Sequence, residues 1–372
     1  MPDKAITIGE YEAAVQGTMA QETARKPISL QFGLAGEIGQ LLSELKKDVR
    51  RDVRNHEEVL QEELGDCLWY LMAICIATKT SLHKVLNEKA TTSINILQRN
   101  EVSKTDRNKL ASSLLATNGA LMKAFNDDDD VDEILQKLAF TLGDFTTSLK
   151  LPFCMEDIAC ANMEKTKGLF GKDFPNLKIL DKDSPDFEQF PRKLETEIRQ
   201  EKVGDDHKAM LFIGRFRYGN ALDDNISGEP DYYRYHDVFH MAFVAHLGWS
   251  PSLRALLNMK RRSNQKTDNN EDGGRVLLME EGLTHYIFRY GKKHNFFEGV
   301  KCPRVSIAVL KTIRDMVEGY EVADRPLALW NDAILNAFEV FLELREHHNG
   351  KITIDMDNRQ LIFENLPKNQ RP

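Results

Sequence analysis

Oxygen-bearing side chains gather in two neighbouring segments of the chain, at spacings that suit a divalent cation. They are Glu37, Gln40, Glu44, Glu62, Glu63 and Asp66. The first three lie at i, i+3 and i+7, and the last three lie within about one helical turn, so two helices would each present them on one side. Carboxylates at close range repel one another unless a cation lies between them, and Mg²⁺ prefers oxygen ligands. The sequence therefore predicts a Mg²⁺ (or Mn²⁺) site between two helices.

The alternative is that these acids are solvated helix surface, as most runs of glutamate are. Two features favour a site. Gly36, Gly39 and Gly65 lie inside the helical patterns, where each costs roughly 1 kcal/mol relative to alanine, which indicates close helix approach or room for a ligand. The acids also adjoin apolar runs such as Leu68–Ile76. We therefore expect them near a core.

The two segments resemble the MazG-type all-α nucleoside triphosphate pyrophosphohydrolases, whose signature is E-x-x-E, a spacer and E-x-x-D. Glu37 matches the first acid, and Glu63 and Asp66 match the second pair. Gln40 departs from the pattern, because a neutral amide stands where the family has its second glutamate. This departure weakens or repositions one metal site, and Glu44 or Glu62 is a candidate substitute.

The resemblance implies an enzyme that hydrolyses (d)NTP to (d)NMP and pyrophosphate with Mg²⁺ or Mn²⁺. It implies that Glu37, Glu63 and Asp66 ligate the metal, with Gln40 or Glu44 completing the ligand set. A water would attack the α-phosphorus, with Glu62 or Glu44 as the base. Trp69 is a candidate for stacking on the base of the nucleotide, although its sequence context favours core packing.

A weak internal repeat follows the first acidic segments. Leu64-Gly-Asp66 returns as Leu142-Gly-Asp144, while Thr117 and Thr141 stand where Glu37 and Glu63 would be. The second copy adds Asn162 and Lys165, which resemble the family's N-x-x-K helix. We interpret the two copies as a covalent pseudo-dimer in which Asn162 and Lys165 contact substrate phosphate or sugar. The alternative is an ordinary helical bundle with coincidental triplets.

A second chemical cluster lies in the C-terminal half. His236 and His240 are at i, i+4, which lets two imidazoles on one helix reach one metal ion. Asp237, Glu281 and His285 supply further ligand types, so these five residues are candidates for a second divalent-metal site. The aspartate in place of the glutamate of H-E-x-x-H argues against a zinc peptidase. The His-Asp dipeptide is similar to that of HD phosphohydrolases, whose other spacings are not evident.

This C-terminal segment also resembles the domain appended to some MazG-like proteins, with its Tyr-His-Asp-x-x-His and Glu-Glu motifs. Two alternative functions remain open. The first repeat would be a nucleotide sensor that does not hydrolyse its ligand and regulates the C-terminal domain, as the neutral Gln40 suggests. Otherwise the chain would be a metal-dependent hydrolase centred on the histidine cluster. Nucleotide-pool control and anti-phage defence are both compatible roles.

The length of the chain and its pattern of segments predict its domains and fold class. A chain of 372 residues predicts two or three domains: residues 1–172 as tandem MazG-like helical bundles (repeats about 1–98 and 105–172), a linker over 173–192, and a domain over 193–372. We expect a mainly α fold, in which the second domain is mostly helical with a small β-hairpin at 351–363.

Charge and cysteine content restrict the environment and the partners. The net charge of −8 makes nucleic acid or an anionic membrane an unlikely partner class, and a nucleoside triphosphate is the expected one; a homo-oligomer is left open. The five cysteines form no C-x-x-C pair and read as reduced thiols. With no signal peptide or apolar run long enough to cross a bilayer, the sequence predicts a cytoplasmic protein.

Overall fold

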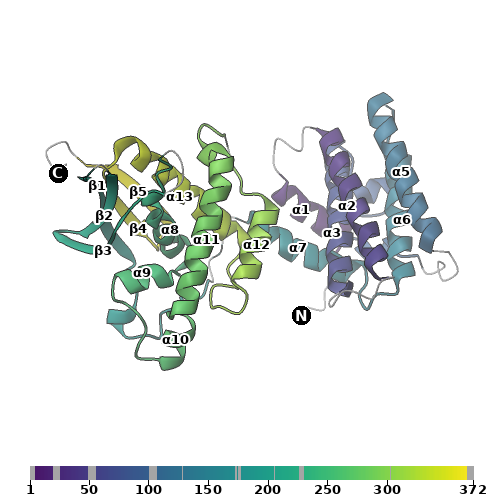
Figure 1. The fold of residues 1–372 in the computed structure, drawn as a ribbon. Helices are drawn as coiled ribbons and strands as arrows, with labels where there is room; N and C mark the ends of the chain where they lie inside the picture. Colours follow the sequence, from purple (N-terminus) through teal and green to yellow (C-terminus); the bar gives the residue numbers. More distant parts are fainter. Residues whose placement is uncertain are drawn as a thin grey trace. The chain divides into compact units, whose positions relative to one another are not determined.

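The computed structural model describes residues 5–19, 26–48, 56–99, 107–127, 129–171, 174, 177–204, 206–225, 230–301 and 303–366. The chain divides into two compact units, Met1–Gly171 and Lys172–Pro372. Figure 1 shows helices in the first unit, and helices with a sheet in the second. The predicted mainly α fold class is confirmed.

The described part of the first unit is helical throughout. Its elements are α1 (Ile8–Thr18), α2 (Pro27–Asp48), α3 (His56–Ala77), α4 (Leu82–Val85), the 3₁₀ turn η2 (Ile94–Leu97), α5 (Arg107–Asp127), α6 (Asp132–Leu149) and α7 (Met155–Phe170). Local signals set some ends: Thr7 and Glu10 form a capping box at the start of α1, and α6 ends where Lys150 adopts a left-handed conformation.

Apolar periodicity explains how α2 and α3 pack against each other. Leu34, Ile38 and Leu41 are buried on one face of α2, at the i, i+4, i+7 spacing of an amphipathic helix. On α3, Leu64 and Leu68 are fully buried in the same core. The acids lie beside these positions in the sequence, so the packing of the two helices determines where the carboxylates are held.

The second unit combines helices with a sheet. Its elements are η4 (Asp186–Glu188), β1 (Lys193–Val203), β2 (Asp206–Ile213), β3 (Phe216–Leu222), η5 (Tyr233–Tyr235), α8 (Asp237–Leu247), α9 (Pro251–Leu256), α10 (Gln265–Asn270), α11 (Gly274–Lys293), η6 (Asn295–Phe297), α12 (Ile307–Met316), α13 (Leu327–His347), β4 (Gly350–Asp355) and β5 (Gln360–Asn365).

The sheet has the strand order β3-β2-β1-β4-β5, and every neighbouring pair is antiparallel. The expected C-terminal hairpin is present as β4 and β5, and Asp355 accepts hydrogen bonds from Asn358 across its turn. The sheet is larger than the predicted hairpin because β1 pairs with β2 on one side and β4 on the other. Helices α8 and α13 pack on each other and on β5.

Residues 177–192, in the stretch expected to be a linker, contain buried side chains of the second unit. Asp181, Glu188 and Phe190 are at most 3% exposed. Arg254 donates to Asp181 at 2.7 Å, and Ser263 donates to Glu188 from its backbone at 2.9 Å. This segment is therefore part of the second compact unit.

Candidate functional site

Three carboxylates meet where α2 and α3 pack together. Glu37 comes from α2, and Glu63 and Asp66 come from one turn of α3. One oxygen from each lies within 4.8 Å of the others, and all three side chains are partly buried. A set of hard oxygen ligands at this spacing fits Mg²⁺ or Mn²⁺.

Helix α7 brings an amide and an ammonium group to the same carboxylate. Asn162 Nδ2 donates to Asp66 Oδ1 at 3.1 Å, and Lys165 Nζ donates to Asp66 Oδ2 at 2.5 Å. Lys165 also pairs with Glu62 at 2.8 Å. Burial alone lowers the pKa of Lys165, but Asp66 and Glu62 raise it above its ordinary value. The site therefore carries a lasting positive charge beside its carboxylates.

Two neighbours fix the position of Asn162, which is 3% exposed. The Tyr11 hydroxyl donates to Asn162 Oδ1 at 2.8 Å, which leaves the Nδ2 group for Asp66. Burial and the charge of Asp66 raise the pKa of Tyr11 well above its ordinary value, so the hydroxyl keeps its proton. A Cβ atom on Gly65 would lie 3.0 Å from Cβ of Asn162. Glycine at this position therefore permits the close approach of α3 and α7.

The negative charge of the cluster affects adjacent groups. Burial raises the pKa of the Cys67 thiol well above its ordinary value, and Glu37, Asp66 and Glu63 raise it further. Cys67 is thus held as a neutral thiol in the core and is no candidate nucleophile.

The remaining residues predicted for this site lie in varied surroundings. Gln40 is exposed on α2, and Glu44 is partly exposed one turn further along. Glu44 and Glu62 are outside the three-carboxylate group found among the described residues. The Trp69 indole donates to the Thr18 hydroxyl at 3.1 Å and packs against the core, which gives it a structural contact.

The second sequence copy has different chemistry at the corresponding positions. Asp144, which corresponds to Asp66, is paired with Arg99. Thr117 and Thr141 are buried. The tandem relationship of the two copies stays a prediction, whereas the approach of Asn162 and Lys165 to Asp66 is seen directly.

A second group of ligand types lies in the other unit, at the start of α8 and on α11. Nitrogen atoms of His236 and His240 and a carboxylate oxygen of Glu281 lie within 4.8 Å of one another. Nε2 of His240 is 3.3 Å from Glu281 Oε1, and Nε2 of His236 is 3.7 Å from Glu281 Oε2. The i, i+4 pair thus converges on one carboxylate, as its spacing predicts.

Hydrogen bonds orient both imidazole rings from behind. His240 Nδ1 donates to Glu280 Oε1 at 2.8 Å, and His236 Nδ1 donates to the Tyr233 carbonyl at 2.9 Å. Glu280 is fully buried and is held by the Ser250 hydroxyl at 2.6 Å and the Ser252 amide at 2.7 Å. Because each Nδ1 donates a hydrogen bond on one side of its ring, each Nε2 on the other side faces Glu281.

Glu280 belongs to the Glu-Glu motif of the sequence but is not among the five residues predicted as ligands, and it supports the cluster from behind. The Glu280-Glu281 dipeptide is visible in the sequence, but a helix turns by about 100° per residue, so the two carboxylates point in different directions. Glu280 is buried and Glu281 is half-exposed. Only the packing of α8 against the α9–α11 region reveals this division of roles.

The other two residues predicted for this cluster differ in placement. Asp237 is buried beside His236, with an oxygen 3.8 Å from Nε2, and burial raises its pKa. His285 is exposed and its ring lies edge-on to Tyr233 with centroids 5.6 Å apart. His285 is outside the group of ligand atoms found in the described part of the chain.

A pocket of about 530 Å³ opens beside this cluster. Its wall includes His236, Asp237 and Glu281, together with apolar side chains from the β3 end, α9 and α11. His236 and Glu281 are thus accessible to a small molecule from this pocket, whereas His240 lies buried behind them.

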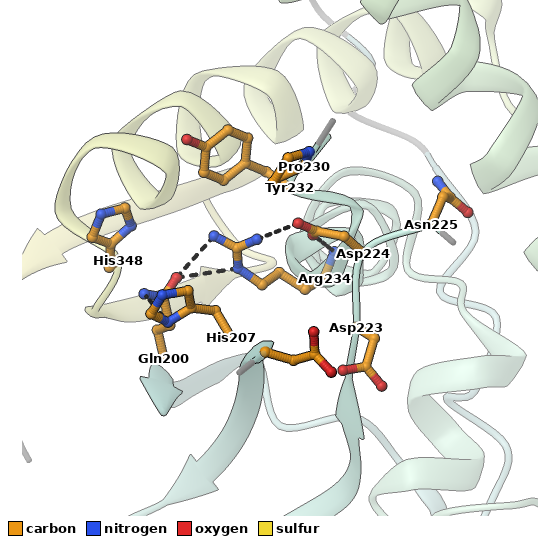
Figure 2. Close-up of a pocket in the computed structure, with 10 residues that line it drawn as sticks. Gln200, His207, Asp223, Asp224, Asn225, Pro230, Tyr232, Arg234 and His348 are labelled. Carbon is orange, nitrogen blue, oxygen red and sulfur yellow. Dashed lines mark hydrogen bonds and ion pairs between the residues drawn. The ribbon is translucent and has the colours of Figure 1, made fainter. Parts of the chain in front are cut away.

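A separate pocket of about 700 Å³ lies between the β1–β2 end and the segment before α8. Figure 2 shows Arg234 at its centre, joined to Gln200 and Asp224. The guanidinium group donates to Gln200 at 2.9 Å and to Asp224 at 2.5 Å. This buried arginine already has its partners. We therefore assign it the structural role of holding the segment before α8 against the sheet.

The structure thus combines a mainly α architecture with two clusters that could each hold a metal ion, one of carboxylates and one of histidine and glutamate. Residues 175–367 match the family model of the MazG C-terminal domain. The match covers just over half of the chain, which therefore belongs to the family that carries this domain. Comparison with curated proteins and with solved structures gave no match. In the described residues, no helix is long and apolar enough to cross a membrane.

Proposed function

We propose that the first unit is a Mg²⁺-dependent nucleoside triphosphate pyrophosphohydrolase that converts (d)NTP and water into (d)NMP and pyrophosphate. The observation that carries the proposal is the convergence of Glu37, Glu63 and Asp66 within 4.8 Å, with the Lys165 ammonium group beside them. A bound triphosphate would use both features, because its negative charge is offset by a metal ion and by a cationic side chain of the protein. Membership in a MazG-related family supports the same reading.

The donor set fits the metal that the motif implies. Carboxylate oxygens from two helices are hard ligands, and the group contains no sulfur or nitrogen. Glu37, Glu63 and Asp66 would hold the ion. When bound, Mg²⁺ offsets phosphate charge and favours attack by water on the α-phosphorus.

The chain's own residues would supply the remaining steps. Lys165, already 2.5 Å from Asp66, would stabilise negative charge on the phosphates. Asn162, held by Tyr11, would orient the sugar or a phosphate through its amide. Glu62 is the proposed base that takes the proton of the attacking water. The bond from the α-phosphorus to the bridging oxygen then breaks, and pyrophosphate leaves with that oxygen.

Product analysis tests the proposal. A panel of NTPs and dNTPs is incubated with the full-length protein and Mg²⁺ or Mn²⁺, and the products are resolved by anion-exchange chromatography. We expect monophosphate and pyrophosphate in equal amounts, and a loss of kcat/KM on the order of 100-fold or more in Glu63→Gln.

The control is Glu343→Gln, which removes an exposed carboxylate from α13 of the second unit. Calorimetric binding of nucleotide without products would instead support the nucleotide sensor. Orthophosphate as the released product would contradict attack at the α-phosphorus.

A further inference from the structure

We propose that His236, His240 and Glu281 form a binding site for a transition-metal ion such as Zn²⁺, Co²⁺, Mn²⁺ or Fe²⁺, in the unit that carries no part of the pyrophosphohydrolase site. This inference is independent of the proposed nucleotide chemistry. Two imidazole nitrogens and one carboxylate suit these ions, whereas Mg²⁺ and Ca²⁺ prefer ligand sets made of oxygen.

The distances between the ligand atoms agree with one shared ion. Ligand atoms about 2.0–2.2 Å from a tetrahedral metal lie roughly 3.3–3.6 Å from each other. The separations from His240 Nε2 and His236 Nε2 to the Glu281 oxygens are 3.3 Å and 3.7 Å. One separation lies within this range and the other slightly above it, so the same carboxylate faces both rings, through its two oxygens, close to the spacing that a bound ion requires.

The hydrogen bonds behind the rings are an independent indication. Ligating histidines commonly donate their second nitrogen to a carboxylate or a backbone carbonyl, which fixes the ring and its tautomer. Here His240 donates to Glu280 and His236 donates to the Tyr233 carbonyl. The His240 ring is fully buried, and among the described residues its Nε2 has no hydrogen-bond partner of good geometry despite its approach to Glu281.

The surroundings leave room for a further ligand. Three protein ligands are typical of catalytic rather than structural zinc, because a coordination position stays open. The pocket of about 530 Å³ has His236 and Glu281 in its wall and Leu222, Leu256 and Leu277 nearby. An ion at this position would be reached by water or by a small molecule with an apolar part. Asp237 is available as a fourth ligand or as a hydrogen-bond partner.

The competing explanation is a proton shared between His240 and Glu281, with no metal. The test uses the full-length protein, stripped with a chelator and titrated with CoCl₂ and, separately, ZnCl₂ in excess Mg²⁺. Visible absorption reports nitrogen ligation of Co²⁺, and calorimetry gives the affinity and stoichiometry for Zn²⁺. The excess Mg²⁺ competes for sites made of oxygen ligands and so reduces the contribution of the carboxylates of the first unit.

We expect one equivalent of Co²⁺ or Zn²⁺ that Mg²⁺ does not displace. Binding should weaken by more than about 100-fold in His236→Gln and in Glu281→Gln. The matched controls are His347→Gln and Glu343→Gln, from a pair on α13 whose atoms are 3.4 Å apart and of which His347 is partly exposed and Glu343 exposed. Glu63→Gln should keep the site intact, which separates this inference from the proposed function.

Equal affinity in wild type and the two ligand variants would overturn the proposal, as would the absence of binding at micromolar metal. Circular dichroism without metal checks the fold of each variant. Glu281 is 47% exposed, so Glu281→Gln should fold and decides the question if His236→Gln does not. A rise in Tm with Zn²⁺ in wild type but not in Glu281→Gln would be a second supporting result.

Discussion

Asp66 is the residue at which the chemistry of the first unit converges. Its two oxygens accept from Asn162 and Lys165, and one of them belongs to the carboxylate group with Glu37 and Glu63. A lysine in this position balances part of the acidic charge before any ligand arrives. In the proposed enzyme the same ammonium group would turn to the phosphates. It would thus offset carboxylate charge in the free protein and phosphate charge in the complex.

Gln40 gives a prediction at the scale of one residue. It lies one turn after Glu37 and is exposed, so Gln40→Glu adds a carboxylate where MazG-type enzymes have one and meets little steric resistance. The number of charged ligands sets cation affinity. We expect the Mg²⁺ concentration for half-maximal activity to fall by roughly 3- to 10-fold, because one added charge contributes on the order of 1 kcal/mol.

The measurement is a Mg²⁺ titration of the initial rate of pyrophosphate release. Gln265→Glu, at the exposed start of α10 in the other unit, adds the same charge as a control. An unchanged Mg²⁺ requirement in Gln40→Glu would mean that this position lies outside the ligand set.

At the scale of elements, two glycines mark where a helix is crossed closely by another segment. Gly65 faces Asn162 of α7, and Gly143 on α6 faces η2. A Cβ added to Gly143 would lie 2.0 Å from the Leu97 carbonyl oxygen. Both belong to the repeated Leu-Gly-Asp triplet. The glycines that adjoin the acids of α2, Gly36 and Gly39, face open space instead. The requirement for glycine therefore comes from crossing segments and not from the acids themselves.

Gly143→Ala should consequently destabilise the first unit. The obstacle is backbone, which cannot rotate away, and overpacking of this kind costs about 1–3 kcal/mol. Gly119→Ala on α5 is the matched control: its added Cβ has no neighbour within 4 Å, so the change should stabilise by up to about 1 kcal/mol through helix propensity. Thermal unfolding followed by circular dichroism compares the two, and a loss of similar size in both would refute the role of the Leu97 contact.

The sequence predicts features that depend on local spacing better than features that depend on contacts between distant segments. The helices were predictable, because spacing along a helix is local information. The approach of Glu37 to Glu63 and Asp66, on another helix, was expected only from the resemblance to a two-helix signature. The strand β1 was not predictable, since its run of Glu, Arg, Gln and Lys has little strand preference and is held by pairing on both sides. Glu280 was missed for a related reason, because its role depends on α9 and α8, which lie far from it in the sequence.

At the scale of the whole molecule, buried ion pairs join distant parts of the second unit. Arg254 is 2% exposed and donates to Asp181 at 2.7 Å and to the Glu188 carbonyl at 2.6 Å, 73 and 66 residues away in the chain. Its guanidinium group also lies 4.0 Å from the centre of the Phe190 ring. The segment before β1 is fixed to α9 through this arginine, which extends the second unit upstream of its sheet.

Asp181→Asn tests this connection and predicts a dependence on pH. Although burial alone raises the pKa of Asp181, the Phe190 amide and the Arg254 guanidinium lower it below its ordinary value. Ionised Asp181 thus stabilises the fold fully above the ordinary pKa of about 3.9, and this contribution is lost as the pH falls through the lower folded pKa. At pH 7 the substitution removes the nearest charged partner of buried Arg254 and leaves Asp272, 4.0 Å from its Nε, as the remaining one. Breaking a buried ion pair in this way costs up to about 3–5 kcal/mol.

Urea unfolding at pH 7 and near pH 3 measures the difference in free energy of unfolding between wild type and Asp181→Asn. We expect this difference in free energy of unfolding to be smaller at low pH, because protonation of Asp181 in the wild type removes the charge that the substitution removes. Asp183→Asn, an exposed neighbour in the same segment, should change stability by less than about 0.5 kcal/mol at either pH. A gap of equal size at both pH values would show that Asp181 acts through its shape and hydrogen bonds, and that its charge does not hold this segment to α9.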